Sequence, residues 1–162
     1  MKKVLIVEDE ILARLGLRQL VDWRKLELEL LPDATDGEEA LEMIRNSCPD
    51  IILLDLNIPK VSGLEILEFL KKEEMPTKVI VVSCQEEFDV VKKAMKLGAY
   101  DYLRKLNLSS DELENILEKC LVETEERITV HMQGIREIRY EEIVRDSRDI
   151  LAGACNYQTL IC

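Results

Sequence analysis

Residues 51–55 read Ile51-Ile52-Leu53-Leu54-Asp55, four apolar residues in a row closed by one acid. Such a run is typical of a short strand that is buried on both faces of a parallel sheet. Residues 4–7 and 79–82 share the pattern, and they end before three consecutive acids and before Ser83, respectively. The three runs therefore predict central strands of one sheet.

Segments with helical spacing of apolar residues alternate with these runs. The predicted helices lie around Ile11–Leu20, Ala40–Ile44, Leu64–Leu70 and Phe88–Met95, and a last one begins at Ser109 or Ser110. Weaker strands are predicted over Leu28–Ala34 and Tyr100–Leu103. Five β-α units favour an α/β fold with a parallel sheet covered on both faces. At this size we expect the flavodoxin-like (βα)5 fold with strand order 2-1-3-4-5.

The residues at the carboxyl ends of the strands are the candidates for a functional site, because ligands bind at that edge of such sheets. The first strand ends before Glu8, Asp9 and Glu10, and the third ends at Asp55. Strands one and three are neighbours in the expected order. We therefore expect Glu8, Asp9 and Asp55 to converge.

Clustered carboxylates repel one another unless a cation intervenes, and oxygen ligands suit Mg²⁺. Lys105 follows the fifth strand and can supply a positive charge for a phosphate, while Ser83 can donate a hydroxyl hydrogen bond. Asp55 would then act as a nucleophile toward phosphorus. Each of these residues alone could be an ordinary loop, capping or surface residue; their joint position at four strand ends favours phosphoryl transfer.

Two other function classes are compatible with the same fold. A phosphohydrolase of the haloacid dehalogenase type has a second Asp two residues after the nucleophile, and Asn57 occupies that position. A nucleotide- or flavin-binding module needs a Gly-rich loop after the first strand, where the chain has three acids that would repel phosphate. We therefore expect neither nucleotide binding nor enzymatic turnover.

Four segments together resemble the receiver domains of two-component response regulators. They are residues 3–10 with the acidic pair, residues 52–59 around Asp55, residues 81–83 ending in Ser83, and residues 98–105 ending in Lys105. Each segment alone is a weak signal, but the combination is specific. The resemblance covers about residues 1–120, which we take as the receiver domain, and it leaves residues 121–162 as an extension.

The resemblance implies a role for each matching residue. Asp55 would be phosphorylated by a sensor histidine kinase, and Mg²⁺ would be held by Glu8, Asp9, Asp55 and the backbone carbonyl of Asn57. Ser83 and Lys105 would bind the phosphoryl oxygens. Tyr102 would turn inward with Ser83 as a switch, which would reshape the face made by the fourth helix, fifth strand and fifth helix.

The chain departs from the family pattern at two positions. Glu8 stands where the family usually has Asp, and Leu106 stands where it usually has Pro after the lysine. A cis bond before Leu costs about 3 kcal/mol. The Lys105–Leu106 bond is therefore expected either to be trans, with Lys105 directed differently, or to be strained.

The pair Asp22-Trp23 and residues 100–103 resemble receivers that precede an AraC-type DNA-binding module in transcriptional regulators. Such a module needs on the order of 100 residues, so the chain is interpreted as a fragment of a longer regulator or as one without an output domain. The net charge is −11, from 22 basic and 33 acidic residues, which argues against direct DNA binding.

The cysteine content and the lengths of the apolar segments indicate where the protein is located. Five cysteines, an odd number without metal-ligand spacing, favour reduced thiols and a cytoplasmic protein, and no segment reaches membrane-spanning length.

Apolar spacings of four and three between Leu117 and Ile138 favour an extended helix that could dimerise as a coiled coil. A helix folded onto its own domain and a strand over residues 128–132 remain alternatives. Residues 155–162 are expected to be poorly ordered.

Overall fold

The computed structural model describes residues 1–84 and 87–123. Its strands are β1 (Lys2–Val7), β2 (Leu28–Leu30), β3 (Ile51–Leu54), β4 (Lys78–Ser83) and β5 (Asp101–Arg104). Its helices are α1 (Ile11–Leu20), α2 (Gly37–Ser47), α3 (Gly63–Lys72) and α4 (Phe88–Lys96), with a 3₁₀ turn η1 (Lys105–Asn107). A further helix covers residues 110–123.

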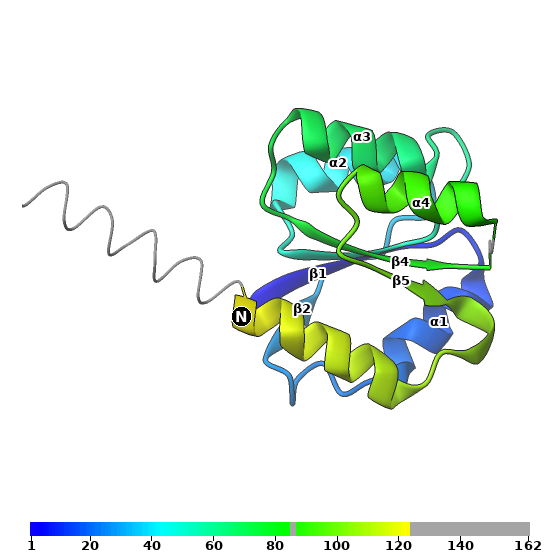
Figure 1. Cartoon of the computed structure of the whole chain (residues 1–162). Helices are drawn as coiled ribbons and strands as arrows, with labels where there is room; N and C mark the ends of the chain where they lie inside the picture. Colours follow the sequence, from blue (N-terminus) through cyan, green and yellow to red (C-terminus); the bar gives the residue numbers. More distant parts are fainter. Residues whose placement is uncertain (85–86, 124–162) are drawn as a thin grey trace, which may run out of the picture. The chain divides into compact units, whose positions relative to one another are not determined.

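All strand pairs are parallel and the sheet order is β2-β1-β3-β4-β5. The predicted flavodoxin-like α/β fold is therefore confirmed. Figure 1 shows three layers, with α2, α3 and α4 on one face of the sheet and α1 and the helix that starts at residue 110 on the other. The loops that follow the strands gather at one edge, which is where the candidate site lies.

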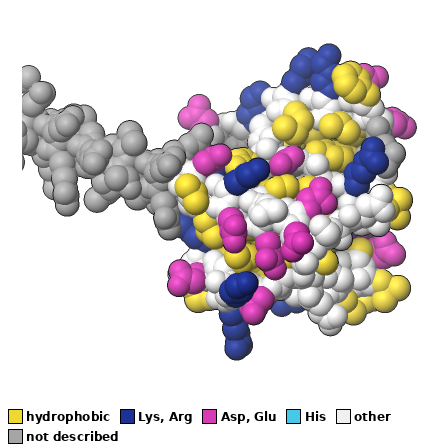
Figure 2. Space-filling model, turned by 60° about the horizontal axis from the view of Figure 1, so that its bottom comes forward, with side chains coloured by type: hydrophobic (Ala, Val, Ile, Leu, Met, Phe, Trp, Pro, Cys, Tyr) yellow, Lys and Arg dark blue, Asp and Glu magenta, His cyan; other side chains and the backbone are white. Residues whose placement is uncertain are grey.

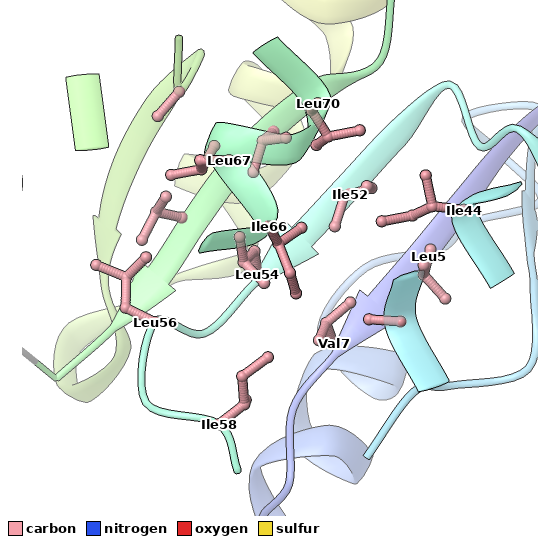
Figure 3. Close-up of a cluster of buried hydrophobic side chains, with 14 of the residues drawn as sticks. Leu5, Val7, Ile44, Ile52, Leu54, Leu56, Ile58, Ile66, Leu67 and Leu70 are labelled. Atoms are coloured by element: carbon pink, nitrogen blue, oxygen red, sulfur yellow. The ribbon is translucent and has the colours of Figure 1, made fainter. Parts of the chain in front are cut away.

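The core lies on both faces of the three central strands. Residues of β3 are almost completely buried, and Leu5 and Val7 of β1 pack with Ile52 and Leu54 under Ile66 of α3 (Figure 3). Alternate residues of a strand point to opposite faces, so Ile6 and Leu53 face the layer that contains α1. This burial on both faces explains why the sequence shows unbroken apolar runs there instead of alternation.

The two edge strands differ in extent from the prediction. β2 ends at Leu30, and pairing resumes only at an isolated bridge between Val7 and Ala34. The Leu31 N–H donates to the Val4 carbonyl and the Ala34 N–H to the Ile6 carbonyl, so the segment after β2 has one more residue than β1 over this stretch and the regular ladder is interrupted. β5 runs one residue later than predicted, from Asp101, because Gly98 at φ +97° first ends the α4 segment.

Three of the described helices begin at a capping side chain, and only the serine cap of the last of them was expected from the sequence. Asp36 accepts a hydrogen bond from the backbone N–H of Glu39 at 2.9 Å and caps α2. Ser62 and Glu65 form a reciprocal capping box at α3. Ser109 accepts from the backbone N–H of Glu112 at 3.2 Å, so it caps the helix over residues 110–123.

Gly37, the first residue of α2, lies too close to Val61 to carry a side chain. Its N–H donates to the Pro59 carbonyl at 3.1 Å, and an added Cβ would lie 2.6 Å from Cβ of Val61 and against the Val61 carbonyl oxygen. Gly37→Ala is expected to lower the free energy of unfolding by about 2 kcal/mol through this overlap. The control is Gly16→Ala, since Gly16 lies within α1 with no atom within 4 Å of a new Cβ; it should stabilise by about 0.5–1 kcal/mol. Urea denaturation measures both, and equal effects would contradict the prediction.

The chain divides at residue 120 into Met1–Cys120 and Leu121–Cys162. The division of residues 1–120 from 121–162 as a receiver and an extension remains a prediction. The expected coiled-coil seam beyond residue 123, the alternative strand over residues 128–132 and the poorly ordered end all lie outside the described residues. No helix among the described residues combines the length and apolarity needed to cross a lipid bilayer.

Candidate functional site

The register of the sheet brings the candidate residues to one edge. Val7 pairs with Leu54 across β1 and β3, so the residues that follow them, Glu8 and Asp55, emerge side by side. The backbone N–H of Asp55 donates to the Val7 carbonyl at 3.0 Å and continues the ladder to this point. The predicted convergence of the first and third strand ends is therefore observed.

The acidic residues form a cluster. Oxygen atoms from Glu8, Asp9 and Asp55 all lie within 4.8 Å of one another. Glu8 is 1% exposed and Asp55 is 6% exposed, whereas Asp9 faces solvent. The cluster is thus open on one side and buried on the other.

Lys105 reaches into this cluster from the end of β5. Its Nζ lies 2.6 Å from Oε2 of Glu8 and 2.8 Å from Oδ2 of Asp55, and its side chain is 17% exposed. No cis peptide bond occurs among the described residues, so the Lys105–Leu106 bond is trans. Of the two alternatives raised by Leu106, the trans bond is observed, and Lys105 still faces the acids.

Glu8 and Lys105 both show altered protonation equilibria. Burial raises the pKa of the Glu8 carboxyl above 4.5 and the charge of Asp55 adds to this, although Lys105 and the backbone N–H of Glu10 act in the opposite direction. Burial alone would lower the pKa of the Lys105 ammonium, but its close contacts with the Asp55 and Glu8 carboxylates outweigh this, and the pKa lies above 10.5. Three carboxylates around one ammonium leave the site with excess negative charge.

The two oxygens of Glu8 have different surroundings. Oε1 accepts a hydrogen bond from the backbone N–H of Glu10 at 3.1 Å. Oε2 is fully buried and has the Lys105 ammonium as an ion-pair neighbour, but this contact lacks hydrogen-bond direction and Oε2 accepts from no other described group. The negative charge on this buried oxygen is therefore offset by Lys105.

The donor set fits a hard divalent cation. Three carboxylates with oxygens close together are the type of ligand that Mg²⁺ or Ca²⁺ prefers, and the exposed side at Asp9 leaves room for water or phosphate oxygens. Asn57, the fourth predicted ligand, donates its backbone N–H to Oδ1 of Asp55 at 3.1 Å. This contact keeps the loop after β3 next to the cluster.

The two predicted switch residues lie on the neighbouring strands. Ser83 ends β4 and is fully buried, and it pairs in register with Arg104, the residue before Lys105. Tyr102 lies in β5 opposite Val81 and is half-buried against the core of the α2–α3–α4 layer. Ser83 therefore lies beside the residue that precedes Lys105, and Tyr102 lies within β5, three residues before Lys105.

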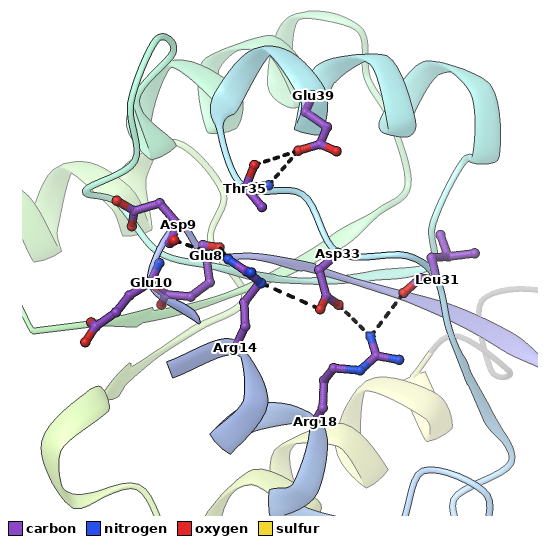
Figure 4. A network of polar contacts seen from close by, with 9 residues as sticks. All are labelled: Glu8, Asp9, Glu10, Arg14, Arg18, Leu31, Asp33, Thr35 and Glu39. Carbon is purple, nitrogen blue, oxygen red and sulfur yellow. Dashed lines mark hydrogen bonds and ion pairs between the residues drawn. The ribbon is translucent and has the colours of Figure 1, made fainter. Parts of the chain in front are cut away.

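The sequence interpretation missed an arginine–carboxylate network beside the acids (Figure 4). Arg14 of α1 donates through Nη1 to the carbonyl oxygens of Glu8 and Asp9, at 3.0 and 3.2 Å. Its Nε lies 3.8 Å from Oδ2 of Asp33, whose Oδ1 accepts from Nη1 of Arg18 at 2.6 Å. The sequence did contain one signal for this network: Arg14 lies one helical turn after Glu10, which is near enough for an arginine to reach the acidic turn.

Residues 4–118 match the model of the response regulator receiver domain. The solved receiver domain of AraT, a response regulator from Geobacillus stearothermophilus, is 32% identical with a TM-score of 0.71, and the match covers 78% of this chain and 97% of that one.

Curated relatives are longer than this chain. An uncharacterized response regulatory protein of Staphylococcus epidermidis is 33% identical over 118 residues, which are 73% of this chain and 46% of the relative. The uncharacterized transcriptional regulatory protein YesN of Bacillus subtilis is 30% identical over 141 residues, which are 87% of this chain and 38% of YesN. The chain thus spans about half of the length of the curated relatives it matches, or less.

Proposed function

The chain belongs to the response regulator receiver domain family, and on that premise we propose that it accepts a phosphoryl group on Asp55 from a sensor histidine kinase. The observation that carries the proposal is the Asp55 carboxylate, which lies between a cation-binding acid cluster and the ammonium of Lys105 at 2.8 Å. This arrangement suits an ionised nucleophile that attacks the electrophilic phosphorus of a phosphoryl group, while the cations offset the negative charge on its oxygens.

The transfer would make one bond and break one. An Asp55 carboxylate oxygen bonds to phosphorus while the bond from phosphorus to the donor breaks, and the electron pair of that bond stays on the donor's leaving group. A carboxylate is already ionised at neutral pH, so the step requires no general base. Lys105 would exchange its contact with Oδ2 for the incoming phosphoryl oxygens, and Ser83 would donate its hydroxyl to another.

A divalent cation would be held by Glu8, Asp9, Asp55 and the carbonyl of Asn57. When bound, Mg²⁺ neutralises charge on the transferring group and orients it. The residues of the chain supply the remaining functions: Glu8 and Asp55 form the buried side of the site, and Asp9 forms its open side. The raised pKa of Glu8 means that protons compete with the cation, so Mg²⁺ affinity should fall on acidification.

The output of the switch would reach other molecules through the face made by α4, β5 and the helix that begins at residue 110. Tyr102 belongs to β5, and Ser83 pairs with the end of that strand, so their rearrangement around the phosphoryl group would alter this face. This face or the helical extension would form a homodimer. A cytoplasmic location, as expected from the cysteines, accords with phosphorylation by a sensor kinase.

Transcription would be controlled through an AraC-type DNA-binding module on the longer regulator. Support comes from the similarity to YesN, a transcriptional regulatory protein. On the face of the described domain turned forward in Figure 2, lysines and arginines are interspersed with acidic side chains. A net charge of −11 also disfavours contact with the DNA backbone by this chain.

The direct test is intact mass spectrometry after incubation with acetyl phosphate, with Mg²⁺ or with a chelator. We expect the mass of one phosphoryl group to be added with Mg²⁺ and little addition with the chelator. Unchanged mass in both samples would contradict phosphoryl acceptance, and equal modification in both would contradict the role of the cation. Peptide mapping of the modified protein should assign the group to the peptide that contains Asp55.

A further inference from the structure

Arg14 contacts the main chain of the acids instead of their carboxylates. One nitrogen, Nη1, donates to the carbonyl oxygens of both Glu8 and Asp9, and the side chain is 17% exposed. These two carbonyls belong to the turn that joins β1 to α1. The guanidinium therefore clamps the backbone from which both acidic side chains project (Figure 4).

The other side of Arg14 faces Asp33, which follows β2. Asp33 is itself fixed by Arg18, whose Nη1 also lies 3.4 Å from the Leu31 carbonyl. The next residue, Ala34, makes two backbone hydrogen bonds at the carboxyl end of β1. Its N–H donates to the Ile6 carbonyl, and its carbonyl accepts from the Glu8 N–H. Arg14 thus joins the acidic turn to a rigid neighbouring segment.

Few other interactions define this turn. Glu10 is the N-cap residue of α1 but makes no capping hydrogen bond with its side chain, and the first turn of α1 contains no acid. Besides backbone hydrogen bonds and the ion pair of Glu8 with Lys105, the turn has the contact of Oε1 of Glu8 with the Glu10 N–H. That contact uses a carboxylate oxygen belonging to the cluster, so cation binding would compete with it.

We propose that Arg14 is a positioning residue for the cation site: by holding the carbonyls of Glu8 and Asp9 against Asp33, it orients their carboxylates toward Asp55. This inference rests on the proposed function. Three successive acids also favour a nearby cation, and Arg14 provides one without occupying a carboxylate oxygen. Residues that orient metal ligands from outside typically change metal affinity by 10–100-fold when they are removed.

The test compares Arg14→Ala with Arg18→Ala. Both variants lose an arginine of α1 that contacts Asp33, but only Arg14 contacts the acidic turn. Isothermal titration calorimetry measures Mg²⁺ affinity, and urea denaturation in chelator measures stability. We expect Arg14→Ala to weaken Mg²⁺ binding about tenfold, with Arg18→Ala within about twofold of the wild type. Excess Mg²⁺ should restore the phosphorylation rate of Arg14→Ala with acetyl phosphate.

Each outcome is decisive for the inference. Equal Mg²⁺ affinities of the two variants would overturn it, even if both are less stable. Arg14→Gln, which can still donate to a carbonyl, covers the case in which Arg14→Ala does not fold; its affinity should lie between those of wild type and a tenfold loss, and wild-type affinity would overturn the inference. A wild-type protein that neither binds Mg²⁺ nor gains a phosphoryl group would instead contradict the proposed function.

Discussion

An Asp55→Asn variant is expected to gain no phosphoryl group from acetyl phosphate and Mg²⁺ under conditions that modify the wild type. Asparagine has the shape of aspartate but no anionic oxygen to attack phosphorus. The fold should be retained, because the Asn57 N–H can still donate to the amide oxygen and Lys105 keeps its ion pair with Glu8 at 2.6 Å. The measurement is intact mass, with circular dichroism to establish folding.

The matched control is Asp50→Asn at the other end of the same strand. Asp50 precedes β3, and its carboxylate accepts from the backbone N–H of Lys3 at 2.8 Å, far along the strand from Asp55. An asparagine oxygen can accept the same bond. This control should be phosphorylated like the wild type. Phosphorylation of Asp55→Asn at the wild-type rate would assign the acceptor elsewhere.

The central sheet and the acid cluster could be predicted from the sequence for one physical reason. Strands buried on both faces give unbroken apolar runs, and parallel register brings their carboxyl ends to one edge. In the structure Val7 of β1 pairs with Leu54 of β3, and this pairing places Glu8 beside Asp55. Neither step required knowledge of loop conformation.

Features that depend on side-chain direction or on contacts between side chains of different elements could not be predicted. Leu106 left the direction of Lys105 open, since sequence does not fix the conformation of the loop after β5. Arg14 and Asp33 lie in different elements, and their pairing depends on how α1 packs beside the loop after β2. That loop was assigned to a strand because apolar residues recur from Leu28 to Ala34, although Pro32 lies among them.

Replacing Lys105 with Met is expected to destabilise the metal-free protein by about 3 kcal/mol, because the substitution leaves buried carboxylates without their cation. Glu8 and Asp55 are almost fully buried, and Lys105 is the cation in contact with both. Methionine approximates the length of the lysine stem, so lost packing contributes little. The measurement is urea denaturation in chelator. Lys60→Met is the control: Lys60 lies 3.0 Å from Asp36 but is 54% exposed, and its loss should change stability little.

The pH dependence separates this electrostatic effect from a packing effect. The pKa of Lys105 lies above 10.5 in the folded protein, so its stabilising contribution is complete below pH 10.5 and is lost only at higher pH. In Lys105→Met, the pKa of Glu8 should rise beyond its already raised value, and protonation would relieve the buried charge. The destabilisation should therefore be larger at about pH 8 than at about pH 5. Mg²⁺ at about 100 times its dissociation constant should restore about 2.7 kcal/mol. A loss that is independent of pH and unaffected by Mg²⁺ would show that Lys105 acts by packing, and the proposed charge arrangement at Asp55 would then be wrong.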